Sequence, residues 1–211
     1  MSNDKEVEFR SSLAGEVAGF GIPELTEHQK ASLVKHYAMV CRWNRQINLT
    51  RIVAPRDAAR LHYAESLFGA RFITHERTVL DIGSGAGFPA IPIAVVKPYL
   101  QVTALEANQR KSLFLKEAIE ALELKNVKVV NIRLEEFDWP PYELLTSRAL
   151  DRASSIFPKL IASLSANQRL MLFSTNESVF KLAEQAGDTY SVARYPIPQS
   201  EARVIVIFTR R

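Results

Sequence analysis

The sequence predicts an α/β protein built on a mostly parallel, doubly wound sheet of seven strands, with an antiparallel hairpin at one edge and a helical segment in front of it. Two observations predict this fold. From residue 76 onward, short apolar runs alternate with stretches of helical periodicity, and strands joined by helices run parallel in one sheet. Over residues 1–75, apolar side chains recur at helical spacing. We therefore expect an N-terminal helical appendage over 1–75 and a sheet domain over 76–211.

The appendage is expected to hold three helices. The Gly19–Pro23 stretch, which contains two glycines and a proline, ends the first. Thr26 and Gln29 have the spacing of a capping box and start the second, which ends at Trp43-Asn44. Pro55 opens the third, because proline suits the first helical position. The expected ranges are about 5–18, 26–43 and 56–72.

The sheet domain is expected to contain seven strands. Each is a short run of mostly apolar or β-branched residues next to turn residues. The last two strands leave no room for a helix between them, so we expect them to form the hairpin. The expected strands are residues 78–82, 102–106, 127–130, 144–147, 170–173, 189–195 and 203–209, and the expected helices are residues 89–96, 109–123, 153–164 and 176–186.

Composition limits the class of protein. The chain has 211 residues, of which 47% are hydrophobic, as in ordinary globular domains. It contains no apolar run long enough to span a membrane, and Met1–Arg10 is polar, unlike a secretion signal. Cys41 is alone in the sequence, so we expect neither a disulfide nor a cysteine metal cluster. We expect a cytoplasmic monomer that needs no metal and does not bind membranes.

The charge of the chain is distributed unevenly. The net charge of +4 is modest, but the segment Lys35–Arg60 holds six basic residues and one acid, Asp57. Such a stretch is either a solvated helical face or a footprint for phosphate groups. The sequence leaves both interpretations open.

The segment Val79–Pro89 carries the clearest functional pattern. Apolar strand residues lead to an acid, three glycines follow at alternate positions, and a proline and a helical run come next. Glycine lets a ligand approach the backbone of a turn, because no Cβ blocks it. A dinucleotide-binding turn would need its third glycine where Phe88 stands. The spacing instead resembles motif I of Rossmann-like S-adenosylmethionine (SAM) methyltransferases, with a structural turn or another nucleotide ligand as alternatives. The candidate cofactor-binding residues are Asp81, Gly83, Gly85 and Gly87.

Two further segments fall where a nucleoside would lie. Glu106 comes 23 residues after Gly83, at the C-terminal end of the second expected strand, and in a doubly wound sheet that point lies beside the glycine turn. Its carboxylate can accept both ribose hydroxyls of an adenosine, or it is a surface acid. Leu134 and Glu135 follow the third strand and would border the adenine, or they start an ordinary helix. Asp81 either organises the glycine turn or touches the ligand.

Five blocks form a more specific pattern in this order: Trp43-Asn44-x-x-x-Asn48-Leu49-Thr50, His62-x-x-Glu65-Ser66-Leu67, Asp81-Ile82-Gly83-Ser84-Gly85-Ala86-Gly87-Phe88-Pro89-x-Ile91-Pro92, Arg133-Leu134-Glu135-Glu136-Phe137 and Ser147-Arg148-Ala149. On these blocks the chain resembles the glucose-inhibited division B family, the bacterial 16S ribosomal RNA guanine-N7 methyltransferases. The resemblance extends over about residues 25–208.

The resemblance implies a class I SAM-dependent methyltransferase with a Rossmann-like sheet. Its methyl acceptor would be a guanine in the 530 loop of 16S ribosomal RNA, near nucleotide 527, and its partner would be that RNA or the small ribosomal subunit. The implied SAM contacts are Gly83, Phe88, Glu106, Leu134, Glu135 and Arg148.

The implied chemistry needs no general base. Guanine N7 has an in-plane lone pair and no proton to lose, so the transfer can depend on proximity and alignment. We place three arginines, Arg133, Arg148 and Arg203, at the RNA or cofactor entrance as candidate catalytic residues. The planar guanidinium suits both phosphate and the guanine edge, although each residue alone is also typical of a surface arginine. Arg110 and Lys111, which open the helix after Glu106, are expected to flank the same mouth.

We expect most of the histidines and Trp43 to have structural roles. His62, inside a matched block, is either near the site or not involved in it. The other histidines are expected on helix surfaces or at helix caps: His28, His36 and His75. Trp43 is expected to pack in the core, with stacking on a flipped base as the alternative.

The sequence departs from the family pattern at four places. Ala90 replaces a frequent glycine and Glu65 replaces an aspartate. Phe173–Asn176 replaces a lysine-glycine step, and Val204 replaces a histidine. The last two fall near the substrate side and put the RNA contacts in doubt. Two other functions are therefore retained: a SAM methyltransferase for a small molecule or protein, and a non-catalytic nucleotide-binding partner of RNA.

Overall fold

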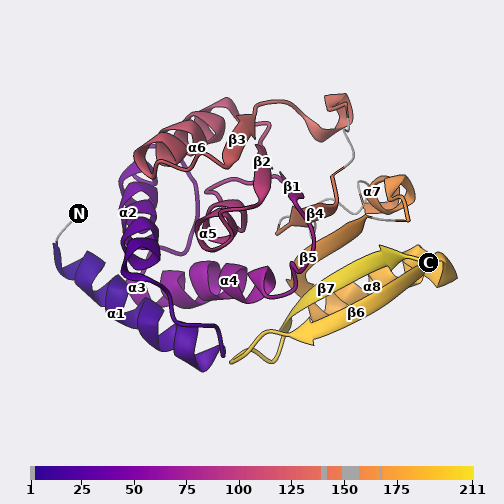
Figure 1. The fold of residues 1–211 in the computed structure, drawn as a ribbon, viewed down its shortest axis with the longest axis horizontal. Coiled ribbons are helices and arrows are strands. Elements are labelled where there is room, and N and C mark those ends of the chain that lie inside the picture. Colours follow the sequence, from indigo (N-terminus) through magenta and orange to yellow (C-terminus); the bar gives the residue numbers. More distant parts are fainter. Residues whose placement is uncertain (1–2, 139–141, 149–156, 167) are drawn as a thin grey trace.

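The structure is a computed structural model that describes residues 3–138, 142–148, 157–166 and 168–211. A seven-stranded sheet runs through the molecule in the order β3-β2-β1-β4-β5-β7-β6. Helices cover both of its faces (Figure 1). This confirms the α/β fold class and the mostly parallel sheet that the sequence predicts.

The elements follow the expected order, with small differences at their ends. The strands are β1 (Thr78–Ile82), β2 (Gln101–Leu105), β3 (Val127–Val130), β4 (Leu144–Ser147), β5 (Arg169–Thr175), β6 (Tyr190–Pro196) and β7 (Arg203–Arg210). The α-helices are α1 (Asn3–Gly19), α2 (Glu27–Trp43), α3 (Pro55–Ala58), α4 (Glu65–Ala70), α5 (Ala90–Val96), α6 (Gln109–Ala121), α7 (Phe157–Ser163) and α8 (Asn176–Ala186). Short turns of other helix types are η1 (Ala59–Ala64), η2 (Leu134–Glu136) and η4 (Gly187–Thr189). Residues 153–156, where the sequence predicts the start of a helix, lie outside the described residues.

Strands β1 to β5 run parallel to one another, and the last two strands form the expected hairpin at one edge. The inner strand of that hairpin, β7, pairs antiparallel with both β5 and β6. Its first residue, Arg203, lies opposite Thr175, the last residue of β5. Because β7 runs against the parallel strands, Arg203 lies at the edge of the sheet where those strands end.

Buried apolar side chains form two clusters, one on each face of the sheet. Alternate residues of β1 point to opposite faces, so Val79 joins one cluster and Leu80 the other. The cluster around Val79 also contains Phe9 of α1 and Tyr37 of α2. The other cluster contains side chains of α7 and α8. The predicted appendage therefore shares a continuous core with one face of the sheet.

The third predicted helix is interrupted. The capping box at the start of α2 is present as expected, with both reciprocal bonds between Thr26 and Gln29. Between α3 and α4, however, the backbone forms a π-helical turn, η1. Turns of this kind occur often at functional sites and leave carbonyl groups open to other donors. Here, the carbonyls of Leu61 and His62 accept hydrogen bonds from Arg148.

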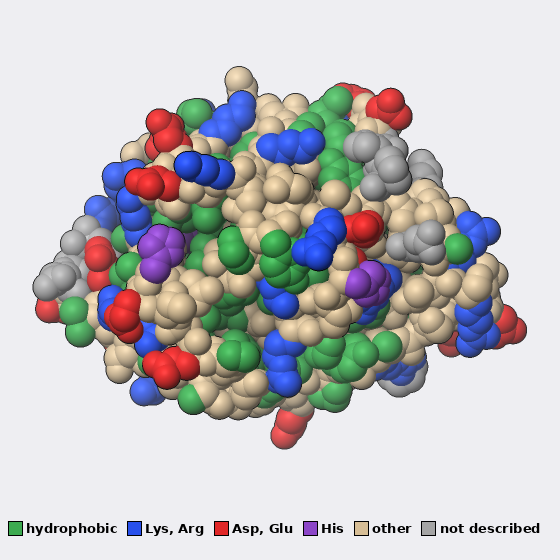
Figure 2. Space-filling view, viewed as in Figure 1, with side chains coloured by type: hydrophobic (Ala, Val, Ile, Leu, Met, Phe, Trp, Pro, Cys, Tyr) green, Lys and Arg blue, Asp and Glu red, His purple; other side chains and the backbone are tan. Residues whose placement is uncertain are grey.

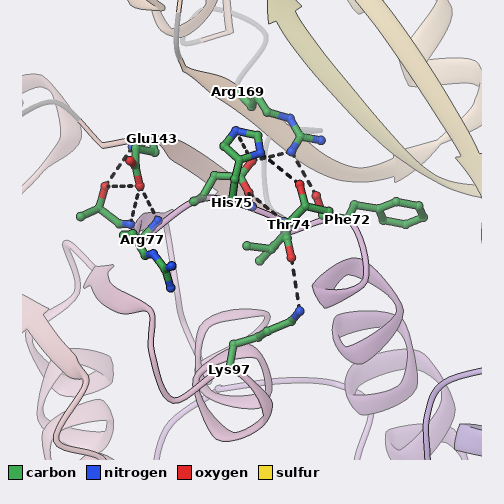
Figure 3. A network of polar contacts seen from close by, with 10 residues as sticks. Phe72, Thr74, His75, Arg77, Lys97, Glu143 and Arg169 are labelled. Atoms are coloured by element: carbon green, nitrogen blue, oxygen red, sulfur yellow. Dashed lines mark hydrogen bonds and ion pairs between the residues drawn. The ribbon is translucent and has the colours of Figure 1, made fainter.

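The opposite edge of the sheet, where the parallel strands begin, is fixed by a polar network (Figure 3). The carboxylate of Glu76 accepts the backbone N–H groups of Thr74 and His75 and pairs with Arg169. Glu143 accepts the N–H groups of Arg77 and Thr78. This network joins the end of the helical segment to β1, β4 and β5, at the edge away from the glycine turn.

Charge and hydropathy are mixed over the surface. On the face in Figure 2, Lys and Arg side chains are interspersed with hydrophobic and acidic ones. None of the described helices is long and apolar enough to cross a membrane.

Candidate functional site

The glycine turn connects β1 to α5 as the sequence predicts. Its three glycines, Gly83, Gly85 and Gly87, have φ values of 72°, 55° and 86°, in the region that favours glycine. Asp81 is fully buried beneath the turn and accepts hydroxyl hydrogen bonds from Ser84 at 2.6 Å and Thr146 at 3.0 Å. Burial raises the pKa of this carboxyl to about 6, although the two hydroxyl donors oppose the shift. These contacts favour the interpretation that Asp81 organises the turn.

Glu106 lies beside the glycine turn. One carboxylate oxygen accepts the Gly85 N–H at 2.8 Å, and the other accepts the Asn108 N–H at 2.8 Å. The amide of Asn131 donates to the Glu106 carbonyl at 2.7 Å and fixes the backbone. A carboxylate offers about four acceptor positions, so each oxygen retains capacity for another donor.

A cavity of about 390 Å³ opens at this edge of the sheet. Its lining consists of the glycine turn, the loop before α3, the π-helical turn, and the ends of β4, β5 and β7. The lining residues are Leu49, Thr50, Ile52, His62, Gly83, Ser84, Gly85, Ala86, Phe88, Lys111, Arg148, Phe173, Ser174, Thr175 and Arg203. The structure thus brings together five of the predicted site residues, together with Lys111 and His62.

The other predicted site residues lie outside this lining. Asp81 accepts a hydrogen bond from Ser84 beneath the glycine turn, Gly87 is part of the turn, and Glu106 contacts the turn at the Gly85 N–H, but none of the three is among the lining residues. Arg133, Leu134 and Glu135 follow β3 at the same edge of the sheet, with Arg133 and Glu135 exposed and Leu134 packed on the second core cluster. The polar contacts that the described residues make include none between Arg133 and Arg148 or Arg203. A catalytic role for Arg133 and a cofactor role for Leu134 and Glu135 stay predictions.

Arg148 and Arg203 share one carboxylate. Both guanidinium groups contact Oε2 of Glu65, at 2.9 Å and 2.6 Å, and the Glu65 side chain is 1% exposed. Burial raises the pKa of Glu65, while the two arginines act in the opposite direction. Arg148 also donates to the Ser66 hydroxyl and lies over the Phe173 ring at 5.3 Å. Two cations and one anion leave this cluster with excess positive charge.

Two buried polar atoms beside the cavity have no hydrogen-bond partner among the described residues: Arg203 Nε and His62 Nδ1. The His62 ring stacks on Phe88 with centroids 4.5 Å apart, and its Nε2 lies 2.8 Å from the Thr50 hydroxyl oxygen. Burial, with help from Arg148 and Arg203, lowers the pKa of His62 to about 3. His62 is therefore a neutral ring in the wall of the cavity.

The expectation that His36 lies on a helix surface or at a cap is wrong. His36 is fully buried in α2, among the rings of Tyr63, Phe88 and Phe114, and its Nδ1 lies 2.9 Å from the Tyr63 hydroxyl oxygen. Burial lowers its pKa to about 3. Helical periodicity places the residue on the apolar side of α2, but the polarity of histidine favours a surface position when the surrounding rings are unknown.

Sequence reasoning also missed the part that Glu65 plays. Glutamate in place of the usual aspartate is a mild change by itself, and no pattern links it to arginines far along the chain. The structure shows where the two departures from the family pattern near the substrate side lie. Phe173 and its two successors line the cavity, whereas Val204 is buried in the second core cluster. Trp43 packs against Phe114 with ring centroids 5.9 Å apart, as expected for a packing residue.

Replacing Gly87 by Ala should destabilise the glycine turn. The residue has φ 86°, and an added Cβ would lie 2.5 Å from Ile91 Cδ1 and 3.3 Å from His36 Nε2. We expect the free energy of unfolding to fall by about 2 kcal/mol or more. Denaturant unfolding measures this. Gly15→Ala is the matched control, because Gly15 is an exposed helix position with nothing within 4 Å, and it should be stabilised slightly. Equal stability of the two variants would contradict the assigned role of Gly87.

Comparisons with known proteins agree on a family. A family model described as rRNA small subunit methyltransferase G matches residues 29–194. A protein named ribosomal RNA small subunit methyltransferase G, from Xanthomonas euvesicatoria pv. vesicatoria, is 41% identical over 127 residues, which cover 60% of this chain and 59% of that protein. The protein of the same name from Solibacter usitatus is 37% identical over 190 residues, covering 83% of this chain and 88% of its own.

Solved structures share the fold. A methyltransferase from Pyrococcus furiosus superimposes with a TM-score of 0.60 at 15% sequence identity, covering 84% of this chain and 97% of that one. At this identity the likeness concerns the fold alone.

Proposed function

Because the chain belongs to the rRNA small subunit methyltransferase G family, we propose that it transfers a methyl group from SAM to N7 of a guanine in 16S ribosomal RNA, in the 530 loop near nucleotide 527. The observation that carries the proposal is the position of the cavity. It lies between the glycine turn, which suits a nucleoside cofactor, and the Arg148–Arg203 pair, which suits an RNA acceptor.

The residues at the glycine turn fit SAM. A Cβ at Gly85 would meet only the Gly83 carbonyl, at 3.8 Å, so the backbone is open to a ligand on that side. The Glu106 carboxylate is held by two backbone N–H groups and can still accept ribose hydroxyls. Bound there, SAM would supply an electrophilic methyl group on a sulfonium. Leu134 and Glu135, on η2 after β3, are the proposed neighbours of the adenine.

The chain's own groups then need only to position the acceptor. Guanine N7 attacks through its lone pair and loses no proton, so no side chain must act as a base. Arg148 keeps its charge at neutral pH, since burial lowers its pKa only to about 10. The Nε–H of Arg203, buried without a partner among the described residues, is available to an acceptor atom of the RNA. Holding the reacting groups in alignment can lower the activation barrier by roughly 7–11 kcal/mol in favourable cases.

The helical appendage is proposed to face the RNA. Its loop before α3 supplies Leu49, Thr50 and Ile52 to the cavity, and its π-helical turn supplies His62. We place the activity in the cytoplasm, where small ribosomal subunits are assembled. We also propose that the protein acts as a monomer and needs no metal.

Transfer of a labelled methyl group tests the proposal. The protein should move tritium from labelled SAM into small ribosomal subunits or 16S RNA from cells that lack this modification, and mass mapping should place the methyl group at the guanine near nucleotide 527. Calorimetry should show binding of SAM and not of NAD. Binding of SAM without labelling of the RNA would leave a methyltransferase for a small molecule or protein. Tight binding of NAD alone would contradict the proposed cofactor.

A further inference from the structure

Three segments meet beside the mouth of the cavity: the C-terminal end of α2, the loop 44–54, and the first two turns of α6. The Trp43 indole N–H donates to Glu117 at 3.2 Å, and its ring packs edge-on against Phe114. The loop contributes Leu49, Thr50 and Ile52 to the cavity, and α6 contributes Lys111. We call the exposed part of these segments, residues 42–53 with 110–113, the rim.

The rim is held in a fixed shape. The Asn44 side chain donates to the Thr50 carbonyl at 2.9 Å and accepts the N–H groups of Leu49 and Thr50 at 2.8 Å and 2.9 Å. The Tyr37 hydroxyl donates to the Val53 carbonyl at 2.8 Å. These bonds fix the backbone of the loop at Leu49, Thr50 and Val53, so its exposed side chains project from a preformed surface.

The cations of the rim have no partners in the described part of the protein. Arg42, Arg45, Arg51 and Arg110 are exposed, and the described residues offer none of them a side-chain hydrogen bond or an ion pair. Their charge differs in this respect from that of Arg10, which pairs with Glu27 on α2. Glu117, an acid next to the rim, accepts a hydrogen bond from the Trp43 indole at 3.2 Å, and no described ion pair joins it to one of these arginines. The rim therefore presents uncompensated positive charge beside the cavity.

The rim also exposes apolar side chains. In the described part of the chain, four large hydrophobic residues are exposed, and two of them belong to the rim: Val53, at 37%, and Leu113, at 51%. Val53 follows the cavity residue Ile52. Leu113 lies one helical turn from Glu117, on the side of α6 that contacts Trp43. Exposed apolar side chains among unpaired arginines are typical of surfaces that contact unstacked bases and phosphates together.

We infer that the rim is the surface on which single-stranded RNA docks, with the arginines on phosphate groups and Val53 and Leu113 against the bases that flank the acceptor. This inference rests on the proposed function, because it takes the cavity as the place of the acceptor guanine. Charge and apolar contact are complementary to RNA on the same surface, and the cavity opens into it. An acidic protein is the alternative partner. It would match the charge of the rim, but it would place no acceptor base in the cavity.

Salt-dependent binding separates the two kinds of interaction. The probe is an unmethylated 16S RNA fragment containing the 530 loop, followed by fluorescence anisotropy. Replacing Arg45 and Arg51 by Ala should weaken binding and reduce the slope of log affinity against log salt by about 1.4, or 0.7 for each phosphate that is no longer neutralised. Lys125→Ala and Lys128→Ala, which remove exposed cations where β3 begins, at the opposite edge of the sheet, should change neither quantity.

The apolar side chains of the rim should respond differently. Val53→Ser and Leu113→Ser together should weaken binding several-fold and leave the salt slope unchanged, because every phosphate keeps its cation. Tyr99→Ser is the matched control, since Tyr99 is 41% exposed just before β2, at the edge where the parallel strands begin, and it should bind as the unaltered protein does. Melting temperatures of all variants should stay equal, since the substituted side chains are exposed.

Two outcomes would overturn the inference. One is unaltered affinity and salt slope in the Arg45/Arg51 variant. The other is a loss of binding to whole small subunits with unaltered binding to the RNA fragment, which would assign the rim to a protein. The proposed function can fail separately. If the protein binds the fragment through the rim but transfers no methyl group to it, the proposed function is contradicted and the docking surface is still supported.

Discussion

Replacing Glu65 by Gln should remove nearly all methyl transfer and lower the free energy of unfolding by about 3–5 kcal/mol. Glu65 is 1% exposed and is the shared anion of Arg148 and Arg203. Glutamine keeps the shape of the side chain but not its charge, so the largely buried guanidinium of Arg148 and the partly exposed one of Arg203 would face each other without a counter-charge. Urea unfolding measures the stability, and labelled SAM measures the transfer.

The exposed pair of Arg10 and Glu27 provides the control. Glu27→Gln removes a carboxylate of the same type from ion pairs with Arg10 and Lys30 at the surface, where solvent screens them, and its melting temperature should hardly change. The position of the acceptor groups can be tested separately from stability. Glu65→Gln should raise the KM for RNA more than the Kd for SAM, since the glycine turn and Glu106 are not part of the cluster. An unchanged KM for RNA in a folded variant would contradict the role assigned to Glu65.

Lowering the pH should destabilise the protein through its buried neutral histidines. The pKa of His36 is lowered to about 3 in the folded state. The unfolded chain takes up a proton below about pH 6.5, which the folded state cannot do, so the stabilisation is lost as the pH falls through this range. Between pH 7.5 and pH 5, His36 alone should account for about 2 kcal/mol of lost stability.

A pair of variants isolates this effect. Tyr63→Phe removes the hydroxyl partner of His36 and should keep the pH dependence, whereas His36→Phe combined with Tyr63→Phe should lose the share that belongs to His36. Denaturant unfolding at pH 7.5 and pH 5 gives the comparison, with each variant as its own reference. Asp81 acts in the opposite direction, since its raised pKa favours the folded state at lower pH, and it is unaltered in both variants. Equal pH dependence in the two variants would contradict the burial of a neutral His36.

Local sequence patterns predicted the parts of the molecule whose contacts are local. The capping box of α2, the alternation of strands and helices, and the glycine turn each depend on residues a few positions apart. The place of Glu106 beside the turn followed from the rule that neighbouring parallel strands end at one edge. These features were predictable because short-range backbone geometry determines them.

The acceptor side of the site was less accessible to sequence reasoning. The π-helical turn contains no proline or glycine that would predict it. Its structural role is visible only in the folded protein, where Arg148 donates hydrogen bonds to its carbonyl groups. The link between Glu65 and Arg203 depends on the antiparallel insertion of β7 next to β5. The burial of His36 depends on which rings surround it. Each of these is a tertiary contact that no spacing in the sequence encodes.

The direction of β7 has a consequence for the order in which the two halves of the site can form during folding. Asp81, Gly85 and Glu106 lie within one strand–helix–strand unit, so local contacts assemble the cofactor half. Glu65 and Arg203 are 138 residues apart in the sequence and meet when β7 has paired with β5. Contacts between distant residues form late, because closing a long loop costs entropy. We therefore expect a folding chain to complete its cofactor half first and to align donor and acceptor only when β7 has joined the sheet.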